Sequence, residues 1–69
     1  MSEDKVFEKM EQMIEEASLE KLYIYKKLAI DEYNRRVEAK MPPNKIFFMV
    51  MFNTMIDVAI KEREHLQRE

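Results

Sequence analysis

Apolar residues recur along this chain with the spacing of an α-helix rather than that of a β-strand. Val6, Met10 and Ile14, for example, fall every four residues and line one side of a helix. The chain also has no glycine, the residue that tight β-hairpin turns need most. We therefore predict an all-α protein in which residues 1–69 form a single small helical domain.

Pro42 and Pro43 are adjacent, and they divide the helical pattern in two. Proline fixes φ and disfavours helix at the residue before it, so a helix is expected to end just ahead of this pair. Pro43 can then occupy the first turn of the next helix, where a missing N–H costs nothing. The pattern predicts an antiparallel helical hairpin with a helix over about 3–40, a turn over 41–43 and a helix over about 44–67.

The first of these helices changes its apolar side near Ser18. Apolar residues up to Ala17 share one face, whereas Leu22, Ile30 and Val37 lie on nearly the opposite face. Ser18 could be the N-cap of a third helix, with Glu20 in the first turn complementing the helix dipole. Alternatively, one continuous helix presents one face to its own chain and another to a partner. The absence of glycine and proline before the turn favours the continuous helix.

The most apolar run of the chain covers 46–60 and is interrupted only by Asn53, Thr54 and Asp57. It is shorter than the roughly 20 residues that span a bilayer, so we predict no membrane segment. A helix that is apolar around so much of its circumference needs more than one neighbouring helix to cover it. We therefore expect the hairpin to complete a helical bundle by association, with a copy of itself or with another protein. The predicted partner interface is Phe48, Met51, Phe52, Met55, Ile56 and Ala59.

Composition narrows the class of protein further. A chain of 69 residues buries only about 60% of the surface that its unfolded form exposes, so its stability is marginal. The chain has no cysteine, which excludes disulfides as a source of extra stability. The first residues lack the basic and apolar pattern of a signal peptide, so we expect a cytoplasmic protein.

Charge is unevenly distributed. Residues 1–20 carry seven acids and two bases, a net charge of −5, and residues 21–50 carry seven bases and three acids, a net charge of +4. The acidic end is expected to lie far from the turn, around which the bases gather. This pattern is typical of a solvated surface, of a site for phosphate groups, or of ends that meet in an antiparallel oligomer. The candidate polyanion contacts are Arg35, Arg36, Lys40 and Lys45.

Candidate chemistry is sparse. His65 is the one histidine, and the chain has no nucleophile motif, phosphate loop or zinc-protease motif. Glu62 and His65 share a helical face, as the ligands of di-metal four-helix proteins do. The pair lies off the apolar face, however, in the charged and solvated segment 61–69. We therefore predict no catalytic residue, metal, cofactor or small-molecule substrate.

The sequence thus favours a non-enzymatic helical interaction module, acting as an adaptor or as an accessory or regulatory subunit of a larger complex. The alternative is a nucleic-acid-binding protein, or a plasmid- or phage-type regulator, that uses the basic residues near the turn. A helical-hairpin dimer of this length resembles plasmid copy-number repressors, but only in architecture, and fold alone does not imply function.

Overall fold

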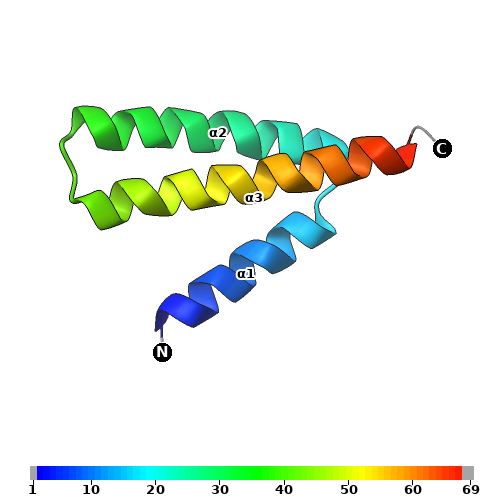
Figure 1. The fold of residues 1–69 in the computed structure, drawn as a ribbon, viewed down its shortest axis with the longest axis horizontal. Helices are drawn as coiled ribbons and strands as arrows, with labels where there is room; N and C mark the ends of the chain where they lie inside the picture. Colours follow the sequence, from blue (N-terminus) through cyan, green and yellow to red (C-terminus); the bar gives the residue numbers. More distant parts are fainter. Residues whose placement is uncertain (1, 68–69) are drawn as a thin grey trace.

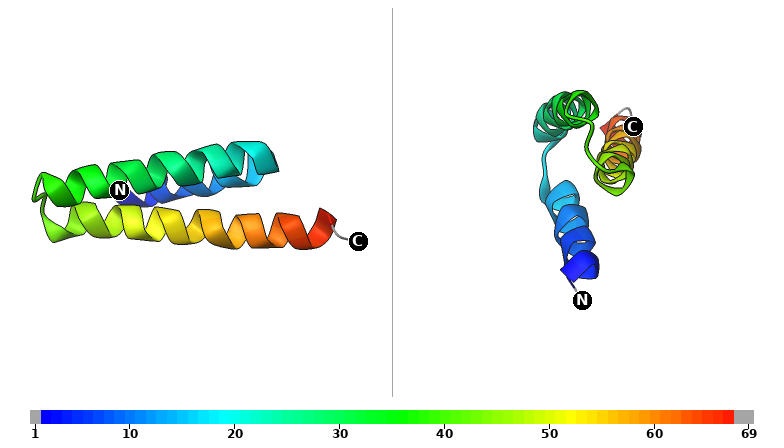
Figure 2. Two further views of the ribbon diagram at one scale, coloured as in Figure 1. Left: turned by 90° about the horizontal axis from the view of Figure 1, so that it is seen from above. Right: turned by 90° about the vertical axis from the view of Figure 1, so that its left-hand side faces the viewer.

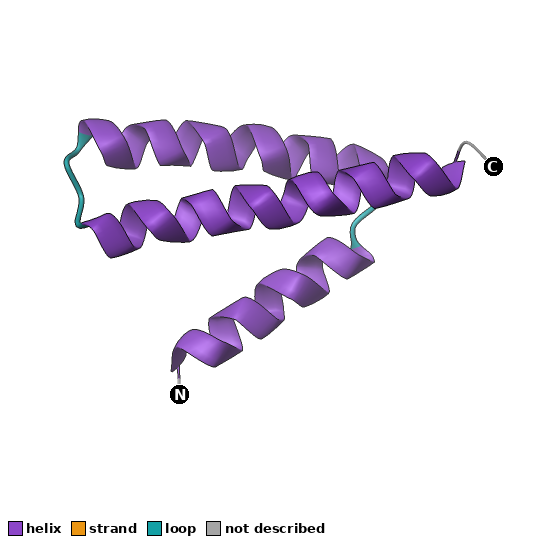
Figure 3. Cartoon of the chain, in the orientation of Figure 1, coloured by secondary structure: helices purple, strands orange, loops and turns teal. Residues whose placement is uncertain are grey.

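A computed structural model describes the backbone of residues 2–67 and the side chains of residues 5–66. Over this part of the chain there are three α-helices, namely α1 (Ser2–Glu16), α2 (Leu19–Glu38) and α3 (Pro43–Gln67) (Figures 1 and 3). No strand occurs among the described residues. The all-α prediction is confirmed.

The three helices form a flat, open array. Helices α2 and α3 lie side by side and antiparallel, whereas α1 runs back beneath them at an angle (Figures 1 and 2). The radius of gyration is 13.1 Å, and the extents are 43 × 28 × 14 Å. A compact domain of this length has a radius of gyration of about 11 Å. Because α1 folds back, its N-terminal end lies toward the same end of the molecule's long axis as the turn between α2 and α3 (Figure 2). The expectation that the acidic end lies at the far end of the molecule is therefore wrong.

The continuous helix predicted over 3–40 does not form, because the chain leaves the helical conformation at Ser18. The backbone of Ser18 is extended, with φ −70° and ψ 165°, and its hydroxyl accepts a hydrogen bond from the Lys21 N–H at 3.2 Å. This is the geometry of an N-cap, in which a serine oxygen replaces the missing partner of an early helical N–H. The alternative in which Ser18 begins a further helix is the one observed.

Arg63 of α3 satisfies the other side of this break. Its guanidinium donates hydrogen bonds to the main-chain carbonyls of Ile14 (3.3 Å), Glu15 (2.6 Å) and Ala17. The last carbonyls of a helix have no partner within the helix, and a cation there also complements the helix dipole. Arg63 is only partly exposed. It therefore caps α1 and ties it to α3. The other side chains of residues 61–66 are exposed, as predicted, and those of residues 67–69 lie outside the described side chains.

The turn between α2 and α3 is closed by backbone hydrogen bonds. The N–H of Met41 bonds the carbonyl of Arg36 at 3.1 Å, and the N–H of Lys40 bonds that of Val37 at 3.0 Å. These two bonds define a Schellman motif, which requires a left-handed residue just after the helix. Lys40 takes this conformation with φ 55°, since the chain has no glycine to place there. Helix α3 then begins at Pro43.

The core draws on all three helices. Leu22 of α2 and Ile56 of α3 are fully buried, and Ala29 is nearly so. Around them the buried cluster is completed by Ile14, Ala17, Met49 and Ile60. At the other end of α1, the ring of Phe7 packs against that of Phe48 with centroids 5.8 Å apart. Within the described helices, no stretch is both long enough and apolar enough to cross a membrane.

Candidate interaction surface

Helix α3 carries a line of exposed apolar side chains on the side away from the core. Phe47 is 59% exposed and Val58 51% exposed, and both are large apolar residues on the most apolar helix. Positions separated by four, seven and eleven residues lie on one face of a helix, so these side chains are aligned. We call this face the outer stripe of α3; it consists of Phe47, Val50, Met51, Thr54 and Val58.

The polar residues of α3 do not interrupt this stripe with unsatisfied donors. The hydroxyl of Thr54 donates to the carbonyl of Val50 at 2.9 Å, and the amide of Asn53 donates to the carbonyl of Met49 at 3.0 Å. A hydroxyl has a single donor, so the bond that Thr54 returns to its own helix leaves no donor that water must satisfy. Thr54 can therefore be buried against another surface through its methyl group.

A groove with an acidic rim lies between α1 and the second half of α3. Its volume is about 430 Å³. The apolar floor comes from both helices, and Arg63, the one base in the lining, is bound to the carbonyls that end α1. We call it the acidic groove; its lining is Glu11, Ile14, Glu15, Thr54, Met55, Val58, Ala59, Glu62 and Arg63.

A second groove, with a basic rim, lies at the start of α3 on the same flank of the outer stripe. It has a volume of about 520 Å³ and an aromatic floor. Its two charged side chains, Arg36 and Lys45, are both basic. We call it the basic groove; its lining is Val6, Phe7, Arg36, Asn44, Lys45, Phe47, Phe48 and Met51.

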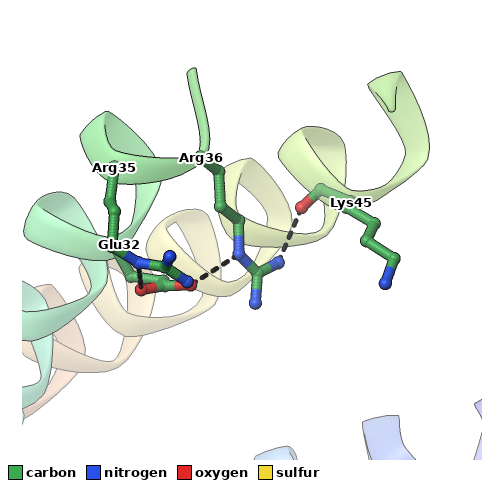
Figure 4. Close-up of polar contacts among 4 residues, drawn as sticks. All are labelled: Glu32, Arg35, Arg36 and Lys45. Carbon is green, nitrogen blue, oxygen red and sulfur yellow. Dashed lines mark hydrogen bonds and ion pairs between the residues drawn. The ribbon is translucent and has the colours of Figure 1, made fainter. Parts of the chain in front are cut away.

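Two of the four bases predicted to contact a polyanion are held by a single carboxylate (Figure 4). Glu32 accepts from the Nε of Arg35 at 2.8 Å, from its Nη2 at 2.7 Å, and from the Nε of Arg36 at 2.8 Å. These hydrogen bonds, from Arg35 first and then from Arg36, lower the pKa of Glu32 to about 2. A carboxylate that is hydrogen-bonded in its charged form resists protonation.

Arg36 also joins α2 to the start of α3. Its Nη1 donates to the carbonyl of Lys45 at 2.8 Å, and its guanidinium lies 5.9 Å from the centre of the Phe48 ring. The amine of Lys45 points away from this cluster (Figure 4) and forms no ion pair with any side chain of residues 5–66. The structure thus gathers Arg35, Arg36 and Lys45 at one end with the exposed Lys40. The two arginines, however, are already bound within the chain, Arg35 to Glu32 and Arg36 to Glu32 and the Lys45 carbonyl.

The predicted partner face is mostly used within the chain itself. Ile56 is 0% exposed. Phe48, Phe52, Met55 and Ala59 are partly buried and pack against the core cluster. Of the predicted set, Met51 is the one classed as exposed. The reason is that α1 folds back along this side of α3, which a continuous first helix could not do.

Sequence reasoning missed Phe47, Val50 and Val58 as surface residues. The signal was present, because positions 47, 51, 54 and 58 follow helical spacing. With a helix apolar on nearly every side, however, spacing alone cannot tell which side the neighbouring helices cover.

The described residues hold no group of three or more His, Cys, Asp or Glu side chains placed to bind a metal ion. The fold and its surface define a small three-helix protein with an exposed apolar stripe that is flanked on one side by two grooves of opposite charge. Comparisons with protein-family models, curated proteins and solved structures give no significant match.

Proposed function

We propose that the protein is a non-enzymatic helical interaction module, an adaptor or accessory subunit that binds protein through the outer stripe of α3. The observation that carries this proposal is the alignment of Phe47, Met51 and Val58 on one exposed face. Isolated apolar residues on a surface are ordinary, but contiguous apolar patches rimmed by polar groups mark sites of association. The two grooves extend this patch on one side and supply charged rims.

A second exposed apolar pair, Ile24 and Leu28 of α2, is smaller and lies between charged residues. It provides a matched control, because Leu28 and Phe47 are each 59% exposed. We expect Phe47→Glu to abolish association with protein, since burying an unpaired carboxylate is costly. Leu28→Glu is expected to leave association unchanged. Cross-linking followed by mass determination, on the purified chain and in the presence of candidate partners, measures both variants. If both variants associate like the wild type, the outer stripe is not the binding surface.

Nucleic-acid binding is the second candidate, and the grouping of four bases at one end of the molecule favours it. Because Glu32 already binds both arginines, Lys40 and Lys45 are left as the principal phosphate contacts. Two contacts give a log–log salt dependence of about −2, which corresponds to weak binding. Anisotropy titrations at two salt concentrations, with Lys40→Glu/Lys45→Glu as the comparison, distinguish this candidate from the interaction module.

A further inference from the structure

We propose, building on this interaction function, that the partner of the outer stripe is a second copy of the same chain. The two α3 helices would pack antiparallel about a two-fold axis that passes close to Thr54. Each copy would then bury its own stripe against the identical stripe of the other, which is the isologous arrangement of most protein homodimers.

The single chain exposes more surface than a compact monomer of its mass, which favours such a partner. The folded chain exposes 5638 Å². A monomeric globular protein of 8.4 kDa exposes about 4,600 Å². The excess is about 1,000 Å² on this scaling, and each partner in a stable protein interface buries about 800 Å². One dimer interface therefore returns the exposed surface of each copy to the range of a compact protein.

The grooves make this face complementary to itself. The acidic groove carries Glu11, Glu15 and Glu62 against a single base, and the basic groove carries two bases and no acid. Both lie on the same flank of the stripe, one near each end. A two-fold rotation about an axis perpendicular to α3 keeps that flank on the same side and exchanges the ends. The basic groove of each copy is thereby placed opposite the acidic groove of the other, twice in the dimer.

The centre of the stripe suits close approach of two helices. Thr54 is its smallest member, and its hydroxyl is already bonded within α3. With the axis near Thr54, Met51 of one copy lies opposite Val58 of the other, and Phe47 lies near Glu62 and the acidic groove. Lys45, whose amine has no ion pair with residues 5–66, is then brought close to the acidic rim.

Mass measurement tests whether the second copy binds. Light scattering over a range of concentrations is expected to give twice the chain mass of 8.4 kDa for the wild type and for Leu28→Glu. Phe47→Glu is expected to give the monomer mass while circular dichroism shows its helices intact. If Phe47→Glu unfolds, the conservative Val58→Ser takes its place, with a weakened dimer as the expected result. A helical wild type that stays monomeric throughout overturns the proposal.

Cysteine cross-linking tests the orientation, and the cysteine-free chain makes every introduced thiol unambiguous. A disulfide needs Cα atoms within about 7 Å. Thr54→Cys is expected to cross-link to itself, and an equal mixture of Met51→Cys and Val58→Cys is expected to cross-link to each other. Neither of the latter alone is expected to do so, because seven residues of helix separate them by about 10 Å. The exposed control Asn34→Cys on α2 is expected to stay monomeric. Efficient self-cross-linking of Met51→Cys and of Val58→Cys alone indicates parallel helices and overturns the antiparallel dimer.

Charge reversal tests the pairing of the grooves. We expect Lys45→Glu to weaken the dimer about tenfold, and Glu62→Lys in the same chain to restore much of the loss. An additive double variant contradicts the pairing. The failure of this inference also differs from the failure of the proposed function. A monomeric chain that binds another protein in a Phe47-dependent way refutes the second copy and leaves the function standing, whereas a chain that binds neither refutes both.

Discussion

Helices α2 and α3 are held together in a different way from α1. Leu22 and Ile56 are fully buried between α2 and α3. Hydrogen bonds and an ion pair also join these two helices at several positions along their length. Tyr23 donates to Glu64 at 3.1 Å, Lys26 forms an ion pair with Asp57, and Arg36 bonds the main chain of α3 near the turn. This pair has apolar and polar contacts at both of its ends.

Helix α1 is attached mainly at its C-terminal end. Ile14 and Ala17 enter the core there, next to the carbonyls that Arg63 binds. Towards its other end, Met10 and the ring contact of Phe7 with Phe48 provide the apolar contacts. No ion pair joins α1 to another helix among the side chains of residues 5–66. Proteins open locally where buried contacts are few, so α1 is expected to be the least protected helix.

The largest effect is expected from the core of the α2–α3 pair. Ile56→Ala removes a side chain that is fully enclosed, and such changes cost about 2–5 kcal/mol of unfolding free energy. Met10→Ala on α1 makes a similar change in a less enclosed place and is expected to cost less. Denaturant unfolding of both variants measures the contrast. Equal losses would show that α1 is as much a part of the cooperative unit as the other two helices.

The anchor of α1 gives the next largest effect. Arg63→Ala removes the donor to the carbonyls of Glu15 and Ala17 and leaves the carbonyl of Ile14 only the Ala17 N–H. Since these sites are only partly buried or exposed, we expect a cost near the lower end of the range for a lost hydrogen bond, about 1 kcal/mol. Hydrogen exchange is expected to rise over α1 and to change little over α2. Arg63→Lys keeps the charge but replaces the planar guanidinium with a compact ammonium, so its exchange over α1 is expected to lie between that of the wild type and that of Arg63→Ala. Uniform acceleration of exchange over all three helices would contradict a local role for Arg63.

Much of the fold could be predicted from the sequence. Pro42 and Pro43 correctly predicted the end of one helix and the start of another, because proline acts on the backbone locally. The phase change near Ser18 was also visible, and it allowed both a continuous helix and a break. Ser18 gave a local signal for the break, whereas Arg63, which binds the end of α1, lies 46 or more residues further along the chain. A long-range side-chain cap of this kind has no local sequence signal.

Less of the candidate surface could be predicted from the sequence. Residues 46–60 were predicted to be too apolar for one neighbouring helix, but the sequence did not show which side of this segment α1 and α2 cover. With α2 along one side of α3 and α1 along another, Ile56 belongs to the core and Phe47 to the surface. The basic residues were found by counting charge, whereas their pairing with Glu32 depended on rotamers that a charge count does not contain.

Removing the N-cap of α2 is expected to lower the free energy of unfolding by less than the core substitution Ile56→Ala does. Ser18→Ala removes the oxygen that accepts from the Lys21 N–H, at a cost of about 1 kcal/mol. Ser18→Asp retains an acceptor and is expected to be nearly neutral, since aspartate is an equally good N-cap. Thermal unfolding of the two variants, compared with the wild type, measures the difference. A loss of the same size in both would mean that the Ser18 hydroxyl does not act as a cap.

The smallest effect is a pH dependence at the other end of α2, where Glu32 binds both arginines. The pKa of Glu32 is lowered from 4.5 to about 2 in the folded chain, chiefly by hydrogen bonds from Arg35 and then Arg36. A carboxyl with a lower pKa in the folded state binds its proton first in the unfolded chain, so acid favours unfolding. The contribution of Glu32 to stability is therefore complete above about pH 4.5, declines as pH falls, and is lost near pH 2.

Other carboxylates also titrate in this range, so the informative quantity is the difference in melting temperature between the wild type and Glu32→Gln. That difference is expected to be constant near neutral pH and to shrink between about 4.5 and 2, because the glutamine side chain does not titrate. The effect is expected to be small, since the site is close to solvent and salt screens such pairs. A difference that stays constant down to the lowest pH would show that the two arginines do not stabilise the charged form of Glu32.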